Sequence, residues 1–166
     1  MFDAVLTENG AGPQTLSEYK ITWADVDLNG HVRSTAYMNY VTNARVEYFG
    51  ARGAPIDGLI ASGLGPVMLR EFVEYKREAR LGDLIRIRMK LKGLSETGER
   101  WVIQHEVVLP DEKTAVIVDV EGAWLDIQQR KMVVPPPHVK DVFLSLERAK
   151  DYAEISARRP ALEIRK

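Results

Sequence analysis

The sequence predicts an α+β fold in which an antiparallel sheet of about five strands wraps around one long central helix. Three observations lead to this fold class. One long stretch, residues 34–50, has helical periodicity, and the stretches that follow it alternate between apolar and polar residues with a period of two. Strands and helices do not alternate along the chain, so a parallel sheet is not supported.

The predicted helix begins with Ser34 or Thr35 as its N-cap and ends near Gly50, Gly53 and Pro55. Polar residues occupy one face, and residues at helical spacing form an apolar and aromatic face: Tyr37, Val41, Ala44 and Tyr48. Further apolar residues widen this face, which indicates a helix mostly surrounded by protein. The tyrosines of this helix, Tyr37, Tyr40 and Tyr48, either line a ligand tunnel or, as is commoner for such a stripe, pack in the core.

Alternation with a period of two predicts strands over residues 18–24, 67–80, 84–92, 100–109 and 114–127. The clearest is 84–92, which has a dry face and a face of four basic residues: Arg86, Arg88, Lys90 and Lys92. Turns are expected at 81–83 and 110–112, and a loop rich in glycine and proline over 54–66. Three prolines, Pro135–Pro137, are expected to end the sheet.

The chain has 166 residues, and its hydrophobic fraction of 45% and charged fraction of 28% are typical of a globular protein with one domain. We expect this domain to span residues 18–137. A flexible N-terminal arm, residues 1–17, would precede it. A C-terminal helical extension, residues 138–166, would follow, with one or two short surface helices over 139–157.

The formal net charge of -1 gives no general attraction to nucleic acid or to an anionic membrane, so neither partner is expected. No apolar segment is long enough to cross a bilayer. The start of the chain, Met1–Ala4, lacks the basic region of a signal peptide, so a cytoplasmic location is expected. The sequence has no cysteine, which excludes disulfides and a thiolate nucleophile. Its histidines are too far apart for a convincing metal site, so no metal is expected.

Residues 23–32 carry the densest chemistry in the chain. Within ten residues they bring together Asp25, Asp27, Asn29, Gly30 and His31, directly before the predicted helix. Aspartate, asparagine and glycine build turns for backbone reasons alone, and Asp25 is interpreted in that way. A turn that also carries a histidine is more typical of an active-site loop that delivers acid–base groups to a helix N-terminus.

Two blocks of sequence resemble hot-dog-fold thioesterases over roughly residues 18–137. Residues 25–32, running into the helix, resemble the Asp-x-Asp-x-x-Gly loop of the 4-hydroxybenzoyl-CoA thioesterase family. They are still more similar to the Asp-x-Asn-x-His element of plant acyl-ACP thioesterases, onto which Asp27, Asn29 and His31 fall. Residues 73–79 resemble the Leu-Glu-Tyr-Arg-Arg-Glu-Cys segment of the same plant enzymes and place Glu78 on their glutamate.

The resemblance implies a hot-dog fold and hydrolysis of an acyl-CoA or acyl-ACP thioester, without a metal or redox cofactor. It also implies a homodimer or a tetramer built as a dimer of dimers, with the active site between subunits. Two departures matter: Ala79 replaces the cysteine of the plant enzymes, and Arg33-Ser34 replaces the paired asparagines of many relatives. The first excludes a cysteine nucleophile, and the second leaves the substrate preference open.

Asp27 is the first choice for the catalytic carboxylate, either as nucleophile or as general base. Asn29 and His31 would position water and the carboxylates, and Glu78 would act as base or orient His31. Backbone N–H groups at the start of the helix would bind the developing oxyanion, and Gly30 would let the backbone approach the substrate. This oxyanion and substrate-binding set is Gly30, Val32, Arg33, Ser34 and Thr35.

Basic side chains are the candidates for binding the phosphates of coenzyme A: Lys76, Arg77, Arg80, Arg86 and Arg88. The alternative for the row on strand 84–92 is a solvated sheet face. His105 alternates with apolar residues and is interpreted as a core histidine, while His138 follows three prolines and is expected at the surface.

Two other functions remain open. A hot-dog hydratase or dehydratase would carry Asp-x-Asn-Pro-x-His, whereas Asn29 is followed here by Gly30 and His31. A non-catalytic acyl-CoA-binding module is the alternative from another class. The sequence does not settle chain length, coenzyme A against acyl carrier protein, or the oligomeric state.

Overall fold

The computed structural model describes residues 16–157. Five antiparallel strands form the body of one sheet, in the order β1 (Leu16–Lys20), β3 (Leu84–Leu94), β4 (Arg100–Val108), β5 (Thr114–Asp126) and β2 (Leu64–Tyr75). Two further strands extend this sheet: β6 (Lys131–Met132) pairs with β5, and β7 (Arg148–Glu154) runs parallel to β3. Within these described residues, the helical segments are η1 (Trp23–Asp25), α1 (Ser34–Ala51), α2 (Ile56–Ala61) and α3 (Pro137–Leu144).

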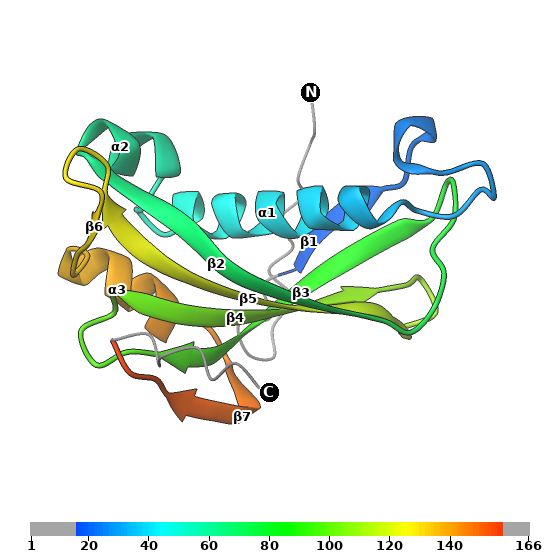
Figure 1. Cartoon of the computed structure of the whole chain (residues 1–166). Helices are drawn as coiled ribbons and strands as arrows, with labels where there is room; N and C mark the ends of the chain where they lie inside the picture. Colours follow the sequence, from blue (N-terminus) through cyan, green and yellow to red (C-terminus); the bar gives the residue numbers. More distant parts are fainter. Residues whose placement is uncertain (1–15, 158–166) are drawn as a thin grey trace, which may run out of the picture.

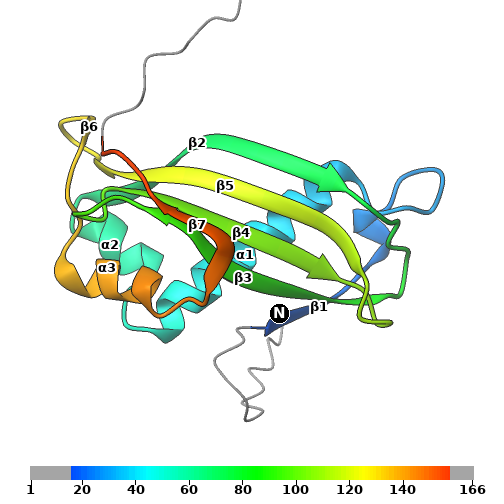
Figure 2. The same ribbon diagram turned by 90° about the horizontal axis from the view of Figure 1, so that it is seen from below.

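The long helix α1 lies across one face of the curved sheet (Figure 1). From below, the strands β2, β5, β4 and β3 lie side by side with α1 behind them (Figure 2). The face of α1 toward the sheet is buried, including Tyr37, Val41, Ala44 and Tyr48, whereas Asn39 and Asn43 are exposed. The expected sheet wrapped around a helix is therefore confirmed, although the face of α1 that carries Asn39 and Asn43 is exposed in the described chain.

Strand β3 has the strict alternation that its sequence predicts. Ile85, Ile87, Met89 and Leu91 are buried, because side chains along a strand point to opposite faces in turn. The basic residues between them are partly exposed. The bounds of the other strands need correction.

Four local expectations are wrong. The first strand ends at Lys20, because the chain turns into η1, where Thr22 donates through its N–H and its hydroxyl to Asp25; Trp23 is 79% exposed as a result. The expected loop over 54–66 contains α2, and β2 ends at Tyr75 instead of residue 80. Arg33, and neither Ser34 nor Thr35, is the N-cap of α1.

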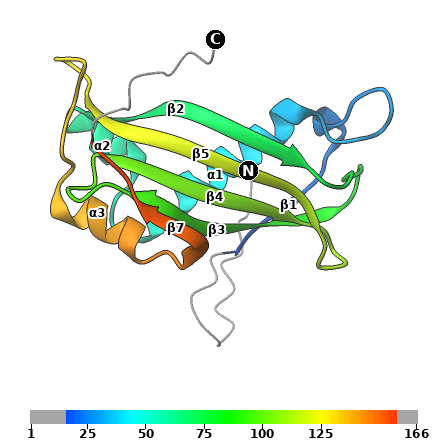
Figure 3. The same ribbon diagram turned by 60° about the horizontal axis from the view of Figure 1, so that its bottom comes forward.

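The C-terminal segment also differs from expectation. Helix α3 is not a surface helix: Val139, Val142 and Phe143 belong to the main core. The sheet does not end at the three prolines, because β7 follows α3 and pairs with β3 (Figure 3). The short helices expected over 139–157 therefore reduce to α3 alone. The expected arm, residues 1–17, lies outside the described residues except for the start of β1.

Candidate active site

The loop before α1 is a tight hairpin. Val26 bridges Val32 in antiparallel fashion, and the Asp27 N–H donates to the carbonyl oxygen of His31 at 2.9 Å. Gly30 has φ +75°, a backbone conformation that favours glycine. The glycine is therefore needed here to close the turn.

The two sequence blocks meet in space. His31 bridges Arg80, and the Val32 N–H donates to the carbonyl oxygen of Ala79 at 3.0 Å. Two tyrosines of α1 hold both segments: the Tyr40 hydroxyl donates to Asp25 Oδ2 at 2.7 Å, and the Tyr37 hydroxyl accepts from the Ala79 N–H at 3.3 Å. Helix α1 therefore fixes the loop and the segment after β2 relative to each other.

Asp27 is exposed and is held by its own loop. Its Oδ1 accepts hydrogen bonds from the Asn29 N–H at 2.8 Å and the His31 N–H at 3.2 Å. The hydrogen bond from His31 is the main reason that the pKa of Asp27 lies below its ordinary value. Asp27 is therefore an ionised, oriented carboxylate at neutral pH.

Asp25 has a structural part, as the sequence interpretation expected. Burial raises the pKa of Asp25, but hydrogen bonds from Thr22 and Tyr40 lower it by more, and the net shift is downward. Asp25 accepts hydrogen bonds from Thr22 before the loop and from Tyr40 on α1, so it anchors the loop to α1.

His31 and Glu78 lie in direct contact. Nε2 of His31 is 3.1 Å from Oε2 of Glu78, and the same carboxylate oxygen lies 3.4 Å from a guanidinium nitrogen of Arg80. Both side chains line a cavity of about 250 Å³ whose wall also includes Val32, Tyr37, Tyr75, Lys76 and Arg77. We call this the 31/78 cavity. Asp27 and Asn29 are not part of its wall, but they belong to the same hairpin as His31.

The backbone N–H groups at the start of α1 divide into two sets. Those of Val32 and Arg33 are occupied, because they donate to the carbonyl oxygens of Ala79 and Asp25. Within residues 16–157, the N–H groups of Ser34 and Thr35 have no hydrogen-bond acceptor. The expected oxyanion donors are thereby narrowed to these two amides at the positive end of the helix dipole.

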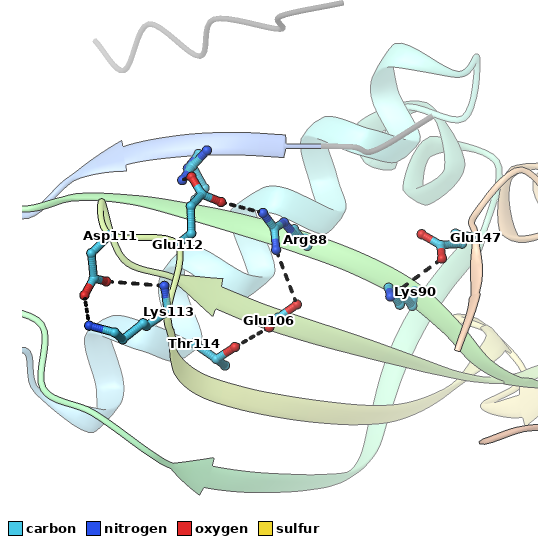
Figure 4. Close-up of polar contacts among 9 residues, drawn as sticks. Arg88, Lys90, Glu106, Asp111, Glu112, Lys113, Thr114 and Glu147 are labelled. Carbon is cyan, nitrogen blue, oxygen red and sulfur yellow. Dashed lines mark hydrogen bonds and ion pairs between the residues drawn. The ribbon is translucent and has the colours of Figure 1, made fainter. Parts of the chain in front are cut away.

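The basic row on β3 is paired with carboxylates on the outer face of the sheet. Arg88 contacts Glu112 at 2.8 Å and Glu106 at 4.0 Å, and Lys90 contacts Glu147 at 3.6 Å (Figure 4). Arg86 also pairs with Glu112, and Lys92 pairs with Asp119 and Asp151. This arrangement favours the solvated-face interpretation of the row over phosphate binding.

The basic residues after β2 are placed differently. Lys76 and Arg77 line the 31/78 cavity, while Arg80 lies against Glu78. Lys76 contacts Glu74 at 3.4 Å, and no carboxylate of the described chain lies within 4 Å of Arg77. These two side chains are therefore the cations nearest the cavity.

The remaining histidines lie as expected. His105 is fully buried, and His138 is exposed at the start of α3. Among residues 16–157, no group of three or more His, Cys, Asp or Glu side chains is placed to hold a metal ion. No helix in that range is long and apolar enough to span a bilayer.

The structure therefore brings together His31, Glu78, Lys76 and Arg77 at one cavity. Asp27 contacts the His31 N–H from the same hairpin, and the amides of Ser34 and Thr35 follow His31 by three and four residues in the chain. Tyr75 is a wall residue that the sequence reasoning missed. The sequence carries no signal for it, because residues three apart on the strand predicted over 67–80 would point to opposite faces; β2 in fact ends at Tyr75, before Glu78.

The comparisons with known proteins identify the family. The profile of the thioesterase-like superfamily matches residues 21–143, so the chain belongs to that superfamily. The expectation of a thioester hydrolase is thus confirmed at the level of the family.

Individual relatives agree with this assignment. A protein of Aquifex aeolicus (strain VF5), whose name proposes an esterase, is 28% identical over 124 residues, which cover 75% of this chain and 93% of the relative. A 1,4-dihydroxy-2-naphthoyl-CoA thioesterase from Synechocystis superposes with a TM-score of 0.72 at 13% identity, over 80% of this chain and 96% of its own. A Staphylococcus aureus protein solved in complex with CoA has a TM-score of 0.76 at 13% identity, over 86% and 91%. These structures confirm the hot-dog fold.

Proposed function

We propose that this protein hydrolyses acyl-CoA thioesters to a free acid and coenzyme A at the 31/78 cavity. The observation that carries the proposal is the contact between His31 and Glu78, 3.1 Å apart, at a cavity beside the ionised Asp27 and the first amides of α1. A carboxylate, an imidazole and amide donors are the groups that acyl transfer needs.

Asp27 supplies the reacting carboxylate, by one of two routes. In the first route, its oxygen attacks the thioester carbonyl, the C–S bond breaks, and coenzyme A leaves as a thiolate that takes up a proton. Water then cleaves the resulting mixed anhydride to the acid and regenerates Asp27. In the second route, Asp27 accepts a proton from water as that water attacks.

The other groups of the site position the substrate. The amides of Ser34 and Thr35 bind the carbonyl oxygen as negative charge develops on it. Glu78 orients the His31 ring, and His31 donates the proton to the departing thiolate. Lys76 and Arg77 receive the phosphates of coenzyme A at the cavity mouth, because guanidinium and ammonium groups match phosphate.

The pairing of His31 with Glu78 is tested by a double-mutant cycle. We expect His31→Ala and Glu78→Gln each to lower kcat/KM by about 10- to 100-fold, and the double variant to lose little more, because the two act as a unit. Release of free thiol from acyl-CoA is the readout. Glu147→Gln is the control, since Glu147 pairs with Lys90 on the outer face of the sheet, outside the 31/78 cavity. Additive losses would contradict a shared role.

We also propose that two copies of the chain pair along β2. This strand of 12 residues stands at one end of the sheet order, so one of its edges has no neighbouring strand among residues 16–157. Phe72 on this strand is 65% exposed. A long edge with exposed apolar side chains is a template for a further strand, and a second copy satisfies it with two-fold symmetry.

The pairing is tested by molar mass in solution. We expect a dimer or a multiple of a dimer by light scattering, and a monomer for Phe72→Lys, because two-fold pairing brings the new charges of both copies together. Leu84→Lys is the matched control: it replaces an exposed apolar residue on β3. A wild-type monomer, or a dimer that Phe72→Lys leaves intact, would refute pairing along β2.

A further inference from the structure

A second cavity lies between the C-terminal half of α1 and the sheet. It has a volume of about 290 Å³, and its walls are mostly apolar: Val46, Phe49, Met68, Trp101, Ile103 and Trp124. Arg45, which also lines it, stands three helical turns from Ser34, about 17 Å along α1. This Arg45 cavity is therefore distinct from the 31/78 cavity, with which it shares no wall residue.

Arg45 is only 8% exposed and carries its charge into this apolar surrounding. Its guanidinium donates to Thr42 Oγ1 at 3.2 Å and contacts the sulfur of Met68 at 3.8 Å and Nε2 of His105 at 3.4 Å. None of these atoms is an anion. No carboxylate among residues 16–157 lies within 4 Å of Arg45; the charge of Glu71 acts on it only from farther away.

His105 supplies an acceptor but no negative charge. Its Nδ1 lies 3.2 Å from the carbonyl oxygen of Val118, so Nδ1 carries the proton and Nε2 accepts from Arg45. Burial, together with the charge of Arg45, holds the pKa of His105 well below its ordinary value. The ring is neutral at pH 7, and it orients the guanidinium without neutralising it.

The energetics of Arg45 call for an anion. Burial lowers the pKa of Arg45 to about 10, so the side chain remains charged at neutral pH. A buried charge whose contacts in the described chain are all neutral, and whose opposing charge, Glu71, is farther away, is costly because it has lost its hydration without gaining a close counter-ion. An anion that enters the cavity would therefore bind tightly, because it supplies the close counter-charge that Arg45 lacks.

Trp101 and Trp124 contribute their rings to the wall of this cavity, while their indole N–H groups are buried and have no acceptor within residues 16–157. Because these N–H groups are not exposed to the cavity, polar recognition in it rests on Arg45.

We propose that the Arg45 cavity binds an organic carboxylate: an apolar body whose carboxylate pairs with Arg45. The volume sets the size of that body. An apolar cavity of about 150 Å³ takes up benzene, so about 290 Å³ accommodates a ring with a short side chain or a medium-length alkyl chain. The carboxylate arrives either as a free acid or as the far end of an acyl group on a thioester.

Binding of the free acid is measured by calorimetry with octanoate and 4-phenylbutyrate. We expect the wild type to bind these acids and to bind octanamide, the uncharged analogue, at least 10-fold more weakly. Arg45→Met should lose acid binding by at least 10-fold, whereas Arg52→Met should not. Arg52 is exposed and stacks on Tyr48 at 3.6 Å, outside the cavity wall.

A second variant keeps the test valid if Arg45→Met does not fold. Val46→Phe fills the cavity from its partly exposed wall and leaves Arg45 in place, so it should also abolish binding. In the arm for the acyl source, Arg45→Met should lower kcat/KM for dodecanedioyl-CoA relative to dodecanoyl-CoA, because a chain of this length reaches from the amides of Ser34 and Thr35 toward Arg45. The proposal is supported if Arg45→Met loses acid binding, or if Arg45→Met loses the activity toward the dicarboxylic thioester relative to the monocarboxylic one. It is overturned if wild type binds no acid and shows no preference that depends on Arg45, or if acids bind equally well to the filled variant.

Because the calorimetric arm needs no turnover, it stands even if the protein proves not to be a thioesterase.

Discussion

Phe143→Ala is expected to destabilise the protein by about 3–5 kcal/mol, a large fraction of the stability of a domain of this size. Phe143 is fully buried, and its ring lies 5.0 Å from that of Phe49 and 5.6 Å from that of Trp101. The alanine leaves a cavity that these large rings fill only in part. Urea unfolding followed by circular dichroism measures the loss.

The adjacent residue provides the control. Leu144 on the same helix is 48% exposed, so Leu144→Ala should change the free energy of unfolding by no more than about 0.5 kcal/mol. Similar effects for both substitutions would mean that α3 is not part of the core.

Asp27→Asn is expected to lower kcat/KM for acyl-CoA by on the order of 10³-fold or more while leaving the fold intact. Asparagine keeps the side-chain oxygen that accepts from the Asn29 and His31 N–H groups, so the hairpin persists. It removes the negative charge, and with it the nucleophile or base. Thiol release gives the rate, and circular dichroism checks the fold.

Asp57→Asn is the matched control, because Asp57 lies in the first turn of α2, outside the loop and the 31/78 cavity. Activity of Asp27→Asn within a few-fold of the wild type would remove Asp27 from the mechanism. A single turnover of the wild type in heavy-oxygen water separates the two routes, because only the anhydride route places label in Asp27.

The sequence predicts those parts of the fold that depend on local periodicity. Strand β3 follows from its alternation, and α1 from its apolar spacing, because each buries one face against a single neighbouring layer. The strand expected to reach Ala24 ends early because the capping contact between Thr22 and Asp25 overrides the alternation. A count of the apolar residues in this segment does not reveal the capping contact or the early end of the strand.

The C-terminal segment was misjudged for a different reason. The short sequence of α3 gives no indication that its apolar residues meet Phe49 and two tryptophans from distant strands. Strand β7 has a charged sequence, Arg148–Glu154, and becomes a strand through its pairing with β3. Tertiary contacts decide both elements.

The candidate site was predictable in part. Two motifs placed His31 and Glu78 together, and the contact between them agrees. The sequence could not show that Asp27 binds its own loop amides, or that the amides of Val32 and Arg33 are occupied. Arg45 was missed because a charged residue on an apolar helix face looks like an ordinary position until its burial is known.

The most direct test of the central claim is release of free thiol by the wild-type chain from a panel of acyl-CoA thioesters that includes crotonyl-CoA. Thioester hydrolysis at the 31/78 cavity predicts catalytic thiol release from at least one member, and no hydration of the crotonyl double bond. Hydration without thiol release would indicate a hydratase, and tight binding with no turnover would indicate a binding module; either result would contradict the assignment.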